Sequence, residues 1–233
     1  MLQVLILAGG LATRLRPVTE KIPKSLVLVN GIPFINYQLR FLREQGVNEV
    51  ILCVGHLGEM IEREVGSGEK FGLNVRYVYD GPHKLGTGGA VKNALKFLDK
   101  NFMLMYGDSY LPVNFKEIQN FFFNTKCFAL MTVYKNRNLL DKSNVRFTGE
   151  RTIEYNKNEP NNEMIFIDYG LSILSTAVFE RYQLSSTFDL AELFHKLSLD
   201  SLLFGYEVIE RFYEIGSFEG LNETEEFLKK AIL

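Results

Sequence analysis

A glycine-rich loop followed by cationic residues is the densest chemical signal in the sequence. The loop runs from Leu7 to Pro17, and the pair Pro23-Lys24 lies seven residues beyond Arg16. Glycine lets backbone N–H groups approach a phosphate closely, Thr13 adds a hydroxyl donor, and Arg14 offers a planar fork to phosphate oxygens. The loop matches neither a Walker A loop nor the G-x-G-x-x-G dinucleotide fingerprint. It favours a triphosphate site, although a plain strand-to-helix turn would also explain the glycine pair alone.

A second glycine cluster lies between Leu85 and Ala90, five residues after Asp80. It reads Leu-Gly-Thr-Gly-Gly-Ala and opens a predicted helix, whose free N–H groups could hold an anion or the edge of a base. A glycine-rich helix start without any ligand is the alternative interpretation.

Asp108 stands just after the apolar run Phe102–Tyr106, which is typical of a buried strand. In open α/β sheets, ligands bind outside the carboxyl ends of the strands. Mg²⁺ prefers hard oxygen ligands and usually takes few protein carboxylates, with substrate phosphates completing its shell. The position therefore predicts Asp108 as a magnesium ligand, with an ordinary Asp-Ser turn as the alternative.

These residues need a scaffold, and the first half of the sequence has the pattern of one. Apolar runs at Val4–Ala8, Val50–Val54 and Phe102–Tyr106 lack period-two alternation, as strands covered on both faces do. Helical patterns separate them, from about Pro33 to Gly46 and from Gly89 to Leu98. The alternation predicts right-handed βαβ units and a mostly parallel sheet through about residue 135.

The second half has shorter, more alternating segments that predict a small antiparallel cap. The expected strands are Asn144–Phe147, Arg151–Tyr155, Met164–Leu174 and Leu203–Ile209, and the expected helices are Thr187–Leu199 and Ser217–Ile232. The predicted fold class is α/β, with a Rossmann-like, mixed but mostly parallel sheet flanked by helices. We expect a single domain over 1–233, with a core at 1–135 that carries both glycine clusters and a cap with the closing helix at 136–233.

Composition excludes several classes of function. The 26 Lys and Arg nearly balance the 28 Asp and Glu, so no basic surplus indicates nucleic acid or an anionic membrane. Cys53 and Cys127 lie far apart in apolar runs without CxxC spacing, which favours buried, reduced thiols. Without an apolar span or a leader pattern, we expect a cytoplasmic protein. The aromatic residues of Phe121–Phe123 and Phe166 favour core packing, with a homodimer interface as the alternative.

The extended loop pattern resembles the sugar-1-phosphate nucleotidyltransferases, also called NDP-sugar pyrophosphorylases. Their signature runs G-G-x-G-T-R-L-x-P-x-T-x-x-x-P-K, and the matching residues are Gly9, Gly10, Thr13, Arg14, Leu15, Pro17, Thr19, Pro23 and Lys24. Ala12 stands where the family usually has glycine. The resemblance covers the whole length and implies Mg²⁺-dependent transfer of a nucleoside monophosphate from an NTP to a sugar 1-phosphate, releasing pyrophosphate. Among short members, the sequence resembles the heptose 1-phosphate guanylyltransferases.

The resemblance also implies that the core at 1–135 is nucleotide-binding and that the cap at 136–233 is sugar-binding, and it implies roles for individual residues. Nucleotide contacts fall to Leu7, Ala8, Gly9, Gly10, Thr13, Arg14, Lys24, Asp80, Gly86 and Thr87. Contacts to the sugar phosphate fall to Gly88, Ser109, Lys157, Asp168, Tyr169 and Gly170, where Gly88 leaves room for the sugar. The metal falls to Asp108 and Glu214, and the catalytic residues are Arg14, Lys24 and Asp108. Glu214 and Asp168 depart from the family's usual aspartate and asparagine.

Several alternatives stay open at this stage. Gly10 leaves room for a larger base, which favours a purine and hence GTP, but uridylyl and cytidylyl transfer remain possible. A non-catalytic sugar-nucleotide sensor would keep the pocket without turnover, and Glu214 is the feature that favours it. A dinucleotide-dependent oxidoreductase would need an acidic residue about 20 residues after the glycine loop, at the end of a second strand, where this sequence has Lys24 and the apolar run Leu26–Val29. His56, His83 and His195 share no spacing and are interpreted as structural or surface residues.

Overall fold

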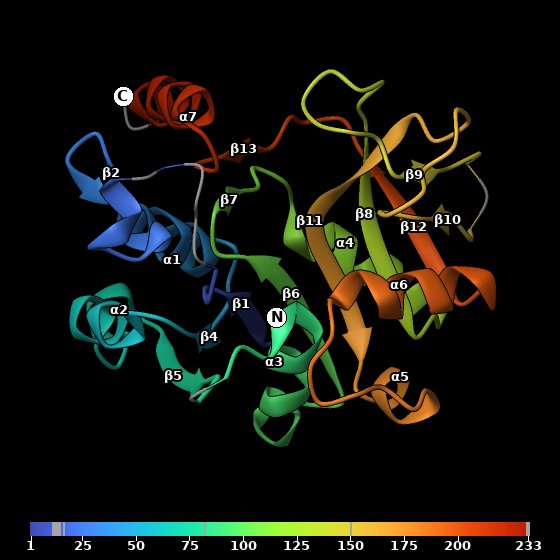
Figure 1. Ribbon diagram of the computed structural model, residues 1–233, viewed down its shortest axis with the longest axis horizontal. Helices are drawn as coiled ribbons and strands as arrows, with labels where there is room; N and C mark the ends of the chain where they lie inside the picture. The colour runs from blue at the N-terminus through green and yellow to red at the C-terminus, as the bar shows by residue number, and fades with distance from the viewer. Residues whose placement is uncertain (11–14, 16, 82, 150, 232–233) are drawn as a thin grey trace.

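A computed structural model describes residues 1–10, 15, 17–81, 83–149 and 151–231 (Figure 1). Four parallel strands form one side of its main sheet, in the order β5-β4-β1-β6. They are β1 (Val4–Leu7), β4 (Glu49–Val54), β5 (Asn74–Tyr79) and β6 (Asn101–Tyr106). In this part of the chain the predicted parallel sheet is confirmed.

The sheet continues with strands from the second half of the chain. β11 (Phe166–Ser175) lies antiparallel between β6 and β8 (Ala129–Lys135), and β12 (Leu203–Val208) pairs parallel with β8. Two short strands, β9 (Val145–Arg146) and β10 (Glu154–Tyr155), extend the antiparallel part. The cap that the sequence predicts is thus joined to the core through β11 and β12, which share its main sheet. The fold class of a mixed α/β sheet flanked by helices is confirmed.

Helices cover both faces of the sheet because successive strand residues point to opposite sides. Val4 and Ile6 of β1 pack with α1 (Phe34–Glu44), α2 (Gly58–Val65) and α4 (Phe115–Thr125). Leu5, between them, packs on the other face with α3 (Gly86–Ala94), α5 (Ala177–Arg181) and α6 (Leu190–Leu199). The buried strands therefore fix two apolar layers around one sheet.

A third apolar cluster joins the two ends of the chain. The C-terminal helix α7 (Phe218–Ala231) contributes Leu228, which packs with Val29 of β2 (Leu28–Val29) and with Ile215. Figure 1 shows α7 returning beside the hairpin of β2 and β3 (Ile32–Pro33), near α1. Short 3₁₀ turns complete the described elements: Val18–Glu20, Lys24–Leu26, Glu69–Phe71 and Leu95–Phe97.

Some boundaries differ from the predicted ones for local reasons. α6 begins at Leu190 and not Thr187, because the Asp189 side chain accepts the N–H of Ala191 and caps the helix. The thiols are unpaired, with Cys53 buried and Cys127 partly buried. Among the described residues, no helix is long and apolar enough to cross a bilayer.

The aromatic residues that the sequence assigns to the core divide between core and surface. Phe122 and Phe166 are buried, but the Phe123 side chain is 47% exposed on α4. Phe121 is partly buried and packs against the core. The core prediction is therefore right for Phe122 and Phe166, partly right for Phe121 and wrong for Phe123.

Candidate active site

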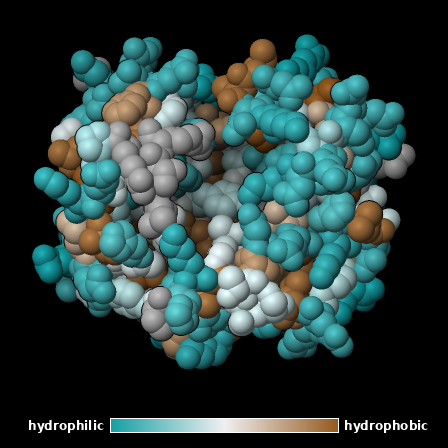
Figure 2. Space-filling model, in the orientation of Figure 1, coloured by the Kyte–Doolittle hydropathy of each residue, from teal (hydrophilic) through white to brown (hydrophobic). Residues whose placement is uncertain are grey.

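Two adjoining cavities open at the carboxyl ends of β1 and β6, on a face that Figure 2 shows hollowed between the two halves of the molecule. The first cavity has a volume of about 460 Å³ and the second about 400 Å³. Tyr106 and Asp108 line both. We name them the first and second cavities below.

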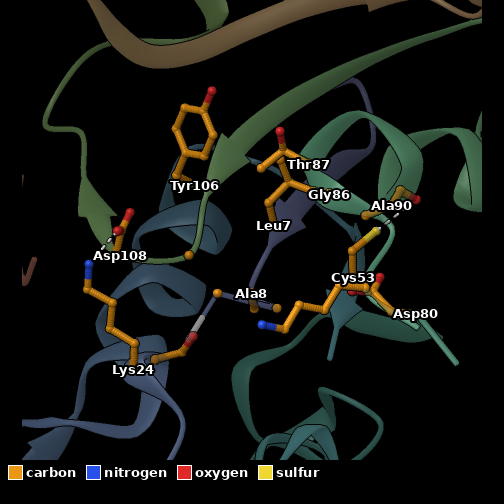
Figure 3. A pocket seen from close by; sticks show the side chains of 15 residues that line it. Leu7, Ala8, Lys24, Cys53, Asp80, Gly86, Thr87, Ala90, Tyr106 and Asp108 are labelled. Carbon is orange, nitrogen blue, oxygen red and sulfur yellow. Dashed lines mark hydrogen bonds and ion pairs between the residues drawn. The ribbon is translucent and has the colours of Figure 1, made fainter. Parts of the chain in front are cut away.

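The first cavity collects most of the predicted nucleotide-binding residues. Those that line it are Leu7, Ala8, Gly9, Gly10, Lys24, Asp80, Gly86 and Thr87, together with Asp108 (Figure 3). Thr13 and Arg14 belong to the same prediction and lie outside the described residues. The second cavity collects Ser109, Lys157, Asp168, Tyr169, Gly170 and Glu214. Apart from Gly88, the predicted site residues that the structure describes thus line one continuous cleft with two parts.

Lys24 and Asp108 form an ion pair at the junction of the cavities. Lys24 Nζ donates to Asp108 Oδ2 at 2.6 Å, and the two side chains are 13% and 31% exposed. Lys24 opens a 3₁₀ turn after Pro23, whose extended backbone directs the chain into the cleft. One predicted phosphate ligand and one predicted metal ligand are therefore already in contact.

A short strand pair brings the second predicted metal ligand to the same place. β7 (Ser109–Tyr110) runs antiparallel to β13 (Tyr213–Glu214), with Ser109 opposite Glu214. The N–H of Ile215 donates to the carbonyl of Asp108 at 3.0 Å, which ties the two segments together. Asp108 and Glu214, separated by more than a hundred residues in sequence, thus line the same second cavity.

Asp80 lies at the other side of the first cavity from the Lys24–Asp108 pair (Figure 3). It follows β5 and faces Gly9 and Gly55, whose lack of side chains leaves its carboxylate room: a Cβ on either glycine would lie 3.3–3.4 Å from Asp80 Oδ2. Burial raises the pKa of the Asp80 carboxyl above its usual value. Gly10 is open, since no atom lies within 4 Å of the place its Cβ would occupy. This side of the cavity offers an acceptor group beside a space without side chains.

The second glycine cluster has a packing role that the sequence did not reveal. Phe188, about a hundred residues away, accepts N–H groups of Gly88 and Gly89 at its carbonyl and donates its own N–H to Leu85. A Cβ on Gly88 would overlap the Phe188 ring. The room that Gly88 leaves is therefore filled by protein, and Gly88 lines neither cavity, contrary to the expectation that it makes space for the sugar. Gly86 and Thr87 of the same cluster do face the first cavity.

A β-bulge aims the predicted sugar-binding residues of β11 into the second cavity. Between Asp168 and Ser172 the strand advances four residues while its partner β8 advances two, from Val133 to Met131. Gly170 takes a φ of +101° there, which suits glycine. Burial raises the pKa of Asp168 to about 6, although the Gly170 N–H and nearby Lys157 act to lower it. The bulge thus holds in the wall of the cavity a carboxyl group that is a weaker acid than an ordinary aspartate.

Lys157 is linked to the first cavity through a residue that sequence reasoning missed. Lys157 Nζ contacts Asp189 Oδ2 at 3.1 Å, and Thr87 Oγ1 donates to Asp189 Oδ1 at 3.0 Å. Burial alone would raise the pKa of Asp189, but the Ala191 N–H, Lys157 and Thr87 together hold it below its usual value. The sequence analysis did not single out Asp189, which falls inside the helix expected over Thr187–Leu199. The signal that could have found it is an aspartate, a common helix-capping residue, just before an apolar run.

The histidines take the structural or surface positions predicted for them. His195 Nδ1 lies 2.7 Å from the carbonyl oxygen of Tyr155, inside the packing of α6. His56 and His83 are exposed, beside a side pocket that adjoins Asp80. None of the three lines either cavity of the cleft.

Comparison with known proteins places this geometry in a family. The model of a family described as nucleotidyl transferase matches residues 3–192. A D-glycero-alpha-D-manno-heptose 1-phosphate guanylyltransferase from Campylobacter jejuni is 35% identical over 118 residues, 51% of this chain and 52% of that protein. An enzyme of the same name from Aneurinibacillus thermoaerophilus is 29% identical over 217 residues, 92% of this chain and 93% of that protein.

Solved structures share the whole fold. HddC from Yersinia pseudotuberculosis, complexed with GMP-PN, has a TM-score of 0.79 at 25% identity, covering 98% of this chain and all of that one. The inositol-1-phosphate CTP transferase from T. maritima has a TM-score of 0.80 at 22% identity, covering 99% and 96%. This second likeness shows the fold alone.

Proposed function

Because the chain belongs to the nucleotidyl transferase family of enzymes, we propose that it joins the guanylyl group of GTP to a sugar 1-phosphate and releases pyrophosphate. The observation that carries the proposal is the shared wall of the two cavities. Asp108 and Tyr106 line both, so a nucleotide in the first cavity and a sugar phosphate in the second would meet beside Asp108.

The reaction needs two anions brought together more than it needs acid or base. An oxygen of the acceptor phosphate attacks the α-phosphorus, and the bond from that phosphorus to the bridging oxygen breaks as pyrophosphate leaves. A phosphate monoester with a second pKa near 6 is already mostly a dianion at neutral pH, so no general base is required. Positioning and charge neutralisation are the main burden of such transfers.

The cations of the cleft stand where this chemistry would use them. Lys24 lies at the junction of the cavities and Lys157 lines the second one. We propose that Lys24 neutralises charge at the α-phosphate and that Lys157 binds the acceptor phosphate. Arg14, outside the described residues, stays a predicted ligand of the outer phosphates.

Mg²⁺ fits the carboxylates that the fold brings together. Among the described residues, no group of three or more Asp, Glu, His or Cys could hold a metal by itself, and two carboxylates completed by substrate phosphates suit this ion. Asp108 and Glu214 would hold it, and it would supply positive charge beside the transferred phosphate. The magnesium requirement is therefore part of the proposal.

Asp80 supports guanine as the base. An ionised carboxylate only accepts hydrogen bonds, and the Watson–Crick edge of guanine offers two adjacent donors, N1–H and the exocyclic amino group. Uracil offers one donor between two acceptors, and cytosine offers an amino group beside acceptors. Two donors matched to two carboxylate oxygens would favour GTP over UTP and CTP, and relatives named as guanylyltransferases support the same choice.

The sugar is proposed from the relatives and from the second cavity. Two relatives are named for a heptose 1-phosphate, and Asp168 could accept hydrogen bonds from sugar hydroxyls there. Mannose 1-phosphate is the closest simpler acceptor in chemistry. The cytoplasmic location and the possible homodimer predicted from the sequence stay predictions.

A matrix of donors and acceptors tests the proposal. The purified chain would be incubated with Mg²⁺, each of GTP, UTP, CTP and ATP, and each of heptose 1-phosphate, mannose 1-phosphate and glucosamine 1-phosphate, and pyrophosphate would be counted. We expect the highest turnover for GTP with heptose 1-phosphate. Faster turnover with UTP or CTP would overturn the guanylyl assignment, and nucleotide binding without pyrophosphate from any pair would favour a sensor.

A further inference from the structure

Gln38 is a buried polar residue that the proposed reaction does not yet use. It lies on α1 with 1% of its surface exposed, next in sequence to the core residue Leu39. Burying an amide costs free energy unless its polar atoms find partners, and here only the nitrogen of Gln38 finds them, since Oε1 is buried without a partner among the described residues. An apolar residue would suit this helix face, so the partners of Gln38 indicate why an amide stands here.

Both donors of Gln38 are directed at the turn that presents Asp108. Its Nε2 donates to the carbonyl oxygen of Tyr106 at 3.0 Å and to that of Ser109 at 2.8 Å. These two carbonyls flank Gly107 and Asp108, so a single amide group spans the turn from β6 to β7. Because carbonyls accept and do not donate, the two contacts also settle which end of the Gln38 amide is nitrogen.

Other contacts to the turn come from backbone groups and from two side chains that reach the carboxylate itself. Ser109 Oγ donates to Asp108 Oδ1 at 3.2 Å, and Lys24 Nζ donates to Asp108 Oδ2. The N–H of Gly107 donates to the carbonyl of Leu7 at 2.9 Å, and the N–H of Ile215 donates to the carbonyl of Asp108 at 3.0 Å. A Cβ on Gly107 would lie 2.9 Å from that Leu7 carbonyl, so the turn sits tightly against β1. Gln38 adds two further hydrogen bonds to the turn from the side of the sheet that α1 covers.

We propose that Gln38 is a positioning residue that fixes the Gly107–Asp108 turn and thereby aims the Asp108 carboxylate at the metal ion. The proposal rests on the proposed function, since it needs a metal at Asp108. Groups that orient a metal ligand without touching the metal typically change metal affinity when they are removed. Gln38 would act in this way through two peptide carbonyls.

The test is Gln38→Met, which keeps the length and flexibility of the side chain but has no N–H to donate. The probe is a fluorescent, non-hydrolysable analogue of GTP, titrated into the full chain with Mg²⁺ and with EDTA. We expect the Kd in Mg²⁺ to rise about tenfold or more, while the Kd in EDTA changes less than about twofold. In turnover, kcat should fall while KM for the acceptor stays close to the wild-type value.

Leu39→Ala is the matched control, because it weakens the same helix by removing buried apolar contacts without touching the turn. It should lower the Tm but leave the gain in affinity from Mg²⁺ unchanged. Should Gln38→Met not fold, Gln38→Asn keeps the amide on a shorter stem, and its Mg²⁺-dependent affinity should fall between those of wild type and metal-free protein.

Equal losses of affinity in Mg²⁺ and EDTA, or the same loss in Leu39→Ala, would make Gln38 an ordinary core residue and overturn the proposal. A wild-type chain without any gain in affinity from Mg²⁺ would overturn it as well. If no donor and acceptor pair yields pyrophosphate but Gln38→Met still loses its Mg²⁺-dependent affinity, the proposed reaction fails and the role of Gln38 stands.

Discussion

Lys24 Nζ lies 2.6 Å from Asp108 Oδ2, so the residue proposed to meet a phosphate and the residue proposed to meet a metal ion neutralise each other. A nucleotide with its metal ion would exchange this one contact for two, since the metal would take the carboxylate and the phosphate would take the ammonium group. The pair keeps two partly buried charges compensated, and breaking it by deleting one partner would leave the other uncompensated.

The first prediction concerns Asp108→Asn. Asparagine keeps the shape of the side chain and can still accept from Lys24, so the chain should stay folded, with a lower Tm because the Lys24 ammonium group loses its counter-charge. Turnover should fall by about 10² or more, because the variant loses the negative charge that binds the metal. Asp99→Asn, at an exposed position, is the control. Near-normal activity of Asp108→Asn in Mg²⁺ would remove Asp108 from the metal site.

The second prediction concerns the base. Asp80→Asn replaces one acceptor with a donor, which conflicts with the two donors of guanine. We expect kcat/KM for GTP to fall about 10- to 100-fold, the usual range for a hydrogen bond to a charged group. The ratio of GTP to UTP activity is the internal control, because a general defect would lower both. An unchanged ratio would mean that Asp80 does not contact the base.

Much of the cleft was predictable because its residues stand at the ends of strands. Parallel strands bring their carboxyl ends to one edge, so Gly9 after β1 and Asp108 after β6 had to lie close together. The sequence pattern of each strand therefore predicted that Gly9 and Asp108 lie at the same edge of the sheet. Glu214 could be placed only through the family resemblance, and the structure brings it beside Ser109.

The remainder depended on contacts between distant segments, which no local pattern records. The insertion of β11 beside β6 joins residues some seventy positions apart, and Gly88 meets Phe188 a hundred positions away. Asp189 caps α6 in the structure, and its second role depends on Lys157 and Thr87. Gln38 was hidden among the apolar residues of a helix.

The third prediction follows from the contact between Gly88 and Phe188. Gly88→Ala places a methyl group into the Phe188 ring, and such overpacking typically costs about 1–3 kcal/mol. We expect a lower Tm, measured by thermal unfolding, with a partial recovery in Gly88→Ala/Phe188→Leu. A sugar contact at Gly88 predicts the opposite pattern, in which the Tm stays the same and KM for the acceptor rises.

The fourth prediction concerns Lys157. Its ion pair with Asp189 is about half exposed, so Lys157→Met should change the free energy of unfolding by less than about 1 kcal/mol. KM for the sugar phosphate should rise about tenfold or more, because a charge-assisted hydrogen bond to phosphate is lost. Lys100→Met, also exposed, is the matched control. A change confined to nucleotide affinity would mean that Lys157 binds the nucleotide and not the sugar phosphate.

The fifth prediction is a pH dependence that arises from Asp168. Burial raises the pKa of its carboxyl to about 6 in the folded chain, against about 3.9 in an unfolded one. Between these values the folded chain binds the proton more tightly, so this residue's contribution to stability declines as pH rises through the interval and levels off above it. Below about pH 4 the carboxyl is protonated in both the folded and the unfolded chain, so its titration no longer changes the stability.

Asp168→Asn removes this titration while its side-chain oxygen can still accept the N–H of Gly170. The Tm of the variant minus that of wild type should therefore increase from about pH 4 to about pH 6.5 and stay constant at higher pH. Other titrating groups cancel in the subtraction, and Asp99→Asn should give a flat line. A flat line for Asp168→Asn would mean that the carboxyl is well solvated, whereas a difference that shrinks with rising pH would mean that its pKa is lowered in the fold.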